Sequence, residues 1–158
     1  MNSLERAIGT TEEIRDALAA EIAVARDERV LIRNMDVDGL LKRAGKRNEF
    51  NVRTAGLQQR LASELGAVAQ EFRMTEVTLD GLKMHAPVEG QRMSSTLAEV
   101  RALAAALSEL DGLNKMLGQR ALSYVRAHIS VLSPRPSAYD RRGGSAVTAR
   151  SSTVVRVV

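Results

Sequence analysis

Residues 100–131 have the sequence VRALAAALSELDGLNKMLGQRALSYVRAHISV, and this stretch decides the fold class. One row of mostly apolar residues steps strictly by three and four positions. Its members are Val100, Leu103, Leu107, Leu110, Asn114, Leu117, Ala121, Tyr124, His128 and Val131. A 3.5-residue repeat of this length is typical of a helix packed along a coiled-coil-like seam. We expect Asn114 to be a buried seam residue that fixes register, Tyr124 to be a seam residue, and His128 to be a partly buried seam residue. The helix should span residues 91–132, because Pro134 disfavours helix in the residue before it.

Two further long helices are predicted upstream, over residues 3–33 and 38–72, because apolar side chains recur there at mostly helical spacing. In the first, Thr10 and Glu13 form a capping-box pattern. We therefore expect the regular helix to open at Thr10, with residues 3–8 extending it backwards. A turn-like cluster separates the two helices: Asn34, Asp36, Asp38 and Gly39.

Residues 73–90 lose the helical period and contain Pro87 and Gly90, so they are predicted to connect the second and third long helices. Thr78 is placed to cap one short helical turn inside this connector, over residues 82–84. Beyond the third helix, residues 133–158 are rich in Ser, Gly and Arg, and we expect a flexible basic tail there.

The composition agrees with packed helices. The chain has 158 residues, of which 44% are apolar but only 3% aromatic, so its core must be built from Leu, Ala, Val, Ile and Met. No cysteine is present, which excludes disulfides and cysteine-based metal sites. We predict an all-α fold, an elongated antiparallel three-helix bundle with a coiled-coil-like seam and a short connector helix, with residues 1–132 as its domain.

The net charge of +4 gives little support to a nucleic-acid-binding function. Residues 1–132 carry 18 basic and 18 acidic side chains, so the whole excess lies in residues 133–158, where five Arg face Asp140 alone. A phosphate-binding domain would show its excess on a structured face. No segment approaches 18 uninterrupted apolar residues and none resembles a signal peptide. We expect a cytoplasmic protein with no nucleic-acid partner and no direct membrane insertion.

The residues available for catalysis are few. His85 in the connector and His128 in the third helix have no partner at a nucleophile or metal-ligand spacing. A phosphotransfer histidine would be followed by Lys-Gly on a regular helix, whereas Ala86 and Pro87 follow His85. We expect no enzyme activity, no cofactor and no metal.

A second apolar row lies beside the end of the seam: Leu122, Val125, Ile129 and Leu132. Together, the two rows make an apolar sector wider than one helix contact requires. Two explanations remain open at this point. Either both neighbouring helices bury the sector, or a partner helix binds to it. Met93 and Met116 in the same helix suit the second explanation, because thioether side chains adapt to varied partners.

The sequence resembles the flagellar export chaperones of the FlgN type. The resemblance runs through residues 113–117 (LNKML) and 122–125 (LSYV), similar to an Asn-x-x-Leu segment late in that family's last helix. It continues after a proline-bearing break into Tyr139-Asp140-Arg141-Arg142-Gly143, which is similar to the family's Tyr-x-x-x-Gly element. Upstream, Thr78-Leu79 and Ala86-Pro87 are similar to its connector.

The resemblance implies a non-enzymatic chaperone that binds the terminal amphipathic segment of hook-associated proteins and delivers it to the cytosolic domain of the export gate. It implies gate docking through Tyr139 and Gly143. The expected oligomeric state is a monomer or weak dimer. A structural coiled-coil adaptor or self-associating helical rod is the alternative. The expected client-binding residues are Leu113, Met116, Leu117, Leu122, Val125, Ile129 and Leu132.

Overall fold

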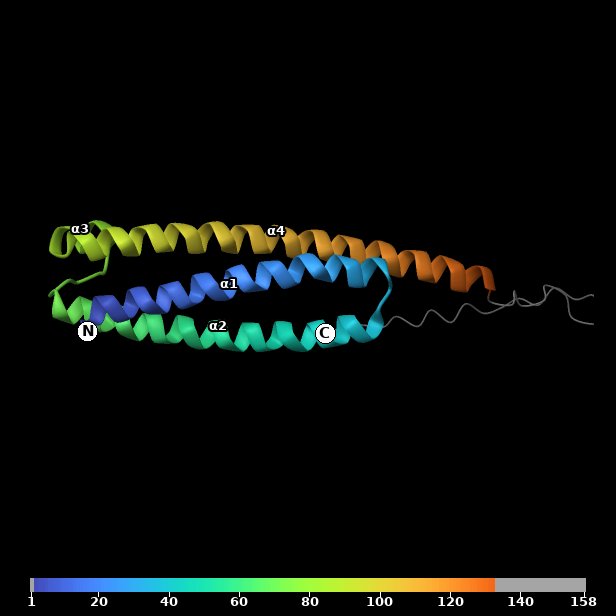
Figure 1. The fold of residues 1–158 in the computed structure, drawn as a ribbon, viewed down its shortest axis with the longest axis horizontal. Coiled ribbons are helices and arrows are strands. Elements are labelled where there is room, and N and C mark those ends of the chain that lie inside the picture. Colours follow the sequence, from blue (N-terminus) through green and yellow to red (C-terminus); the bar gives the residue numbers. More distant parts are fainter. Residues whose placement is uncertain (1, 133–158) are drawn as a thin grey trace, which may run out of the picture. The chain divides into compact units, whose positions relative to one another are not determined.

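The structure, a computed structural model, describes residues 2–132 and is shown in Figure 1. These residues form helices and contain no strand, so the all-α prediction is confirmed for this part of the chain. In chain order the helices are α1 (Ser3–Arg33), α2 (Val37–Glu71), α3 (Leu79–His85) and α4 (Pro87–Leu132). The chain divides into two compact units, Met1–Leu122 and Ser123–Val158, and α4 contributes residues to both.

α1 has the predicted range of residues 3–33, but it begins at Ser3 and not at the capping box expected at Thr10. Asn2 is the N-cap, and its side chain accepts a hydrogen bond from a backbone N–H of the first turn at 2.8 Å. Thr10 is buried inside the helix, where its hydroxyl accepts a hydrogen bond from Arg60 Nε at 2.9 Å. The predicted capping box is therefore wrong. The additional first turns bury Leu4 and Ile8, which favours helix before Thr10.

Both α1 and α2 are followed, directly after the C-cap residue, by a residue in the left-handed backbone conformation, Met35 and Arg73, each with φ of 53°. After α1, the N–H of Asp36 donates to the carbonyl of Leu31 at 3.0 Å, and the N–H of Met35 donates to Ile32 at 3.1 Å. These two bonds define a Schellman motif. The same pair of bonds follows α2. Glycine is the usual residue at the left-handed position, because it has no Cβ.

The connector contains the predicted short helix. The Thr78 hydroxyl accepts a hydrogen bond from the N–H of Gly81 at 3.1 Å and caps α3, as expected. α4 starts earlier than predicted, at Pro87, because proline is favourable in the first turn of a helix. Gly90 is buried in this turn, and a Cβ added there would lie 2.6 Å from the backbone nitrogen of Lys83. α4 therefore packs tightly on α3.

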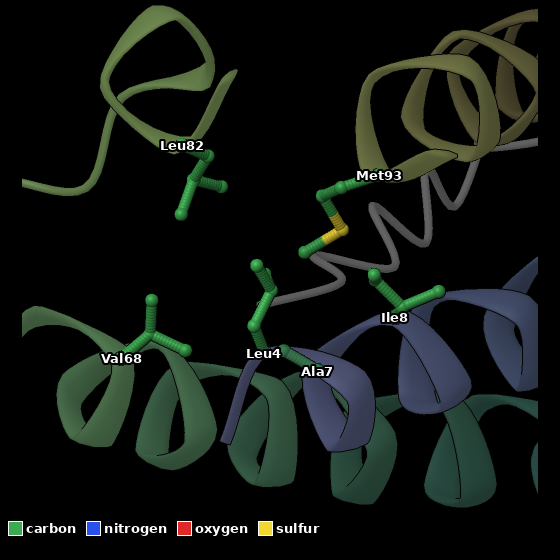
Figure 2. Close-up of a cluster of buried hydrophobic side chains, with 6 residues drawn as sticks. All are labelled: Leu4, Ala7, Ile8, Val68, Leu82 and Met93. Carbon is green, nitrogen blue, oxygen red and sulfur yellow. The ribbon is translucent and has the colours of Figure 1, made fainter. Parts of the chain in front are cut away.

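Two apolar clusters hold the helices of Met1–Leu122 together. The first joins all four helices, as Figure 2 shows, and consists of Leu4, Ala7, Ile8, Val68, Leu82 and Met93. The second joins α1, α2 and α4 and consists of Ile14, Leu18, Ile22, Ala25, Leu57 and Leu107. Burial of each large aliphatic side chain in these clusters contributes roughly 1.5–3 kcal/mol.

Polar contacts set the directions of the three long helices. Ser3 bonds to Glu71, and Arg43 bonds to Glu28 at 3.1 Å, so α1 and α2 run antiparallel, as in Figure 1. α1 and α4 run in the same direction within Met1–Leu122, with bonds that join Glu12 to Arg92 and Ala25 to Asn114.

Candidate functional site

The apolar row near the end of α4 is exposed. Leu122 has 57% of its surface accessible to solvent. Within Ser123–Leu132, the exposed fractions are 37% for Val125, 58% for Ile129 and 82% for Leu132. The described residues therefore leave much of this apolar surface uncovered.

Asn114 positions the part of α4 that precedes this row. It is buried, and its Nδ2 donates to the carbonyl oxygen of Ala25 at 2.8 Å. Its Oδ1 accepts a hydrogen bond from Arg29 Nε at 3.3 Å. Asn114 thus joins α4 to α1 in a fixed register. Three neighbouring candidate residues are left partly exposed around it, namely Leu113, Met116 and Leu117.

A groove of about 310 Å³ lies within Met1–Leu122, between the C-terminal end of α1 and α4. Its apolar lining comes from both elements, and two arginines of α1 complete it. The lining residues are Arg29, Ile32, Arg33, Met35, Leu117 and Ala121. Of these, only Leu117 was among the predicted site residues.

The seam prediction is wrong at its C-terminal end. His128 is exposed instead of partly buried, and the seam positions Tyr124 and Val131 are exposed as well. Within Met1–Leu122, α1 ends at Arg33, which lines the groove together with Leu117 and Ala121. Within Ser123–Leu132, the rings of Tyr124 and His128 contact each other edge to face, with centroids 4.2 Å apart.

Histidine and carboxylate side chains show no arrangement suited to metal binding in residues 2–132, where no three such groups come together. His85 is exposed and stacks on Phe72, with ring centroids 5.5 Å apart. Of the four helices described, none is long and apolar enough to cross a membrane.

The buried charges join the long helices to one another. Glu21 and Arg43 are both buried and form an ion pair between α1 and α2. Arg47 contacts the same Glu21 oxygen at 2.8 Å and also pairs with Asp111 of α4. All of these carboxylates have basic partners, so we assign the cluster to helix packing.

The predicted gate-docking residues Tyr139 and Gly143 lie outside the described residues. The sequence did not predict that Arg29 and Arg33 of α1, or Met35 of the turn after it, line the groove. One signal was present, because Met35 is an apolar residue inside a cluster of turn-forming polar residues.

Residues 2–132 are thus helical with an exposed apolar helix face, the kind of surface on which amphipathic helices bind in other proteins. The family model described as FlgN protein matches residues 1–146, so the chain belongs to the FlgN family. The predicted resemblance is thereby confirmed. This is a family of flagellar export chaperones and not of enzymes, and membership implies binding of flagellar hook-associated proteins. No curated protein and no solved structure matches the sequence significantly.

Proposed function

We propose that this chain is a cytoplasmic export chaperone. It binds the terminal amphipathic segment of hook-associated proteins and delivers them to the cytosolic domain of the flagellar export gate. The observation that carries the proposal is the exposed apolar row of Leu122, Val125, Ile129 and Leu132 in a chain of the FlgN family. The client face continues upstream over Leu113, Met116 and Leu117. Its scaffold is an elongated antiparallel three-helix bundle over residues 1–132.

Client capture follows from the burial of apolar surface. An amphipathic segment that leaves water to lie on this row gains roughly 25 cal/mol for each Å² of apolar surface removed from water. Ordering of the segment offsets part of that gain. The resulting moderate affinity suits a protein that must release its client at the gate.

A charge placed in the apolar row tests the client site. We expect Val125→Asp and Ile129→Asp each to weaken binding of a hook-associated protein by roughly 10- to 100-fold, because the new carboxylate would be desolvated under the client. Isothermal titration calorimetry with the full-length chain measures the affinity, and circular dichroism checks that helicity is retained.

Ala127→Asp is the matched control. Ala127 is also exposed in the last turns of α4, but its spacing from Val125 and Ile129 places it on the opposite side of the helix. We expect this variant to bind the client as the wild type does. If the folded Val125→Asp and Ile129→Asp variants also kept wild-type affinity, the proposed client site would be wrong.

Delivery to the gate is assigned to Tyr139. We expect Tyr139→Ala to leave client affinity unchanged and to weaken association with the cytosolic domain of the gate. Tyr124→Ala, which removes the other tyrosine of the chain, is the control for loss of an aromatic ring. Equal recovery of the gate domain by wild type and Tyr139→Ala in a pull-down would contradict this assignment.

A further inference from the structure

The groove between α1 and α4 has the form of a helix-binding site. Arg29 and Arg33 are one helical turn apart on α1, and Leu117 and Ala121 are one turn apart on α4. α1 and α4 run in the same direction, so the groove is flanked by parallel ridges. A third helix packs on such ridges through its own side chains at spacings of three and four.

Met35 occupies the end of this groove at a conformational cost. Its φ of 53° belongs to the left-handed region, which is unfavourable for a residue with a Cβ and is usually taken by glycine in a Schellman motif. Its side chain lines the groove and is partly exposed. A strained apolar residue kept at an open groove suggests a function for its side chain beyond termination of α1.

The charge at the groove is basic. The Arg33 side chain has no hydrogen-bond or ion-pair partner among the described residues, and the Arg29 side chain has only the neutral Asn114 amide. The Asp36 carboxylate, next to Met35 in the chain, accepts a hydrogen bond from the N–H of Gly39 at the start of α2 and forms no ion pair with Arg29 or Arg33. The groove therefore complements a carboxylate.

We propose that this groove is part of the client site and binds a helical client segment that carries a carboxylate beside its apolar face. This inference rests on the proposed function, because it concerns the same client. The apolar side chains of the segment contact Ile32, Met35 and Leu117, and its carboxylate pairs with Arg29 and Arg33. Two structural elements thus form the site, the end of α1 as well as α4.

The first test separates the binding role of Met35 from its role in the turn. We expect Met35→Gly to keep or raise the melting temperature, because glycine relieves the left-handed conformation, and to lower client affinity about tenfold through loss of apolar contact. Arg73→Gly makes the same change in the Schellman motif after α2. It should likewise not lower the melting temperature, and it should leave client affinity unchanged.

The second test addresses the carboxylate. The probe is a fluorescein-labelled peptide of the terminal helical segment of a hook-associated protein from the same bacterium, and anisotropy reports its binding to the full-length chain. We expect Arg33→Gln to lower affinity about fivefold. Arg101→Gln, an exposed arginine of α4 outside the groove, should have no effect. A peptide with the facing Glu or Asp changed to Gln or Asn should lose at least as much, because it loses its pairs with both arginines, and Arg33→Gln should cause no further loss.

The outcomes separate this inference from the proposed function. If Val125→Asp weakens peptide binding while Met35→Gly and Arg33→Gln do not, the groove inference is overturned and the proposed function stands. If no terminal peptide binds to the wild type, both are overturned. If Met35→Gly changes only self-association in sedimentation experiments, the groove binds a second copy, which also overturns the inference.

Discussion

Gly90 permits the close approach of α3 and α4. A Cβ at this position would lie 2.6 Å from the nitrogen of Lys83, whereas a Cβ at Gly112, further along α4, would meet nothing within 4 Å. We expect Gly90→Ala to lower the free energy of unfolding by about 1–3 kcal/mol through overpacking. Gly112→Ala should raise it by about 0.5–1 kcal/mol, because alanine favours helix. Urea denaturation measures both, and similar effects of the two substitutions would contradict the tight packing at Gly90.

Ser3 and Glu71 join the start of α1 to the end of α2. The Ser3 hydroxyl and, at 3.2 Å, the Ser3 backbone N–H donate to Glu71 Oε2, and they hold the pKa of Glu71 below its usual value. A lowered folded-state pKa stabilises the fold fully above the unfolded pKa of about 4.3, and the contribution is lost as pH falls through the folded pKa.

The consequence is a pH-dependent effect of Ser3→Ala. We expect this variant to be less stable than wild type at neutral pH, with a difference that shrinks as acid protonates Glu71. Urea denaturation of both proteins, from neutral pH to about pH 3, measures this difference. A difference that stayed constant over the whole range would show that the Glu71 carboxylate is not involved.

At the scale of helices, the buried ion pair of Glu21 and Arg43 joins α1 to α2. Glu21→Ala would leave the buried Arg43 with Glu28 alone, at 3.1 Å. We expect a loss of about 3 kcal/mol in the free energy of unfolding. Asp16→Ala removes an exposed carboxylate of α1 that pairs with Arg15, and it should change stability by less than about 1 kcal/mol. Equal losses in urea denaturation would contradict the structural role of the buried pair.

The long helices could be predicted from sequence because their apolar side chains repeat over many turns. Local signals at their ends were less reliable. The Thr10 and Glu13 pattern suggested a helix start, but tertiary burial of Leu4 and Ile8 extends α1 to Ser3. Conversely, the seam pattern continues to Val131, although Tyr124, His128 and Val131 are exposed. The apolar period of a helix does not by itself show which of its residues are buried.

The exposed row on α4 could likewise be proposed from its spacing, whereas the groove on α1 could not. Met35 follows α1 and lies in no helical repeat, so its place beside Leu117 depends on how the turn brings it back toward α4. Arg29 and Arg33 appear in the sequence as ordinary surface charges. Only the structure places them along one apolar groove.

At the scale of the whole molecule, the rival to a chaperone is a self-associating helical rod. We expect a monomer or weak dimer, so light scattering should give a mass close to 17.2 kDa at low concentration. A dimer whose mass stayed constant on dilution, and which dissociated on Ile129→Asp, would support the rod instead.

Hydrogen–deuterium exchange of the full-length chain, with and without a hook-associated protein, tests the central claim most directly. The client is present at a free concentration of a hundred times Kd. The predicted result is slower amide exchange in residues 113–132. The exchange slows by up to about 100-fold at amides whose local opening requires release of the client. Unchanged exchange throughout residues 113–132 in a complex that demonstrably forms would contradict client capture by the end of α4.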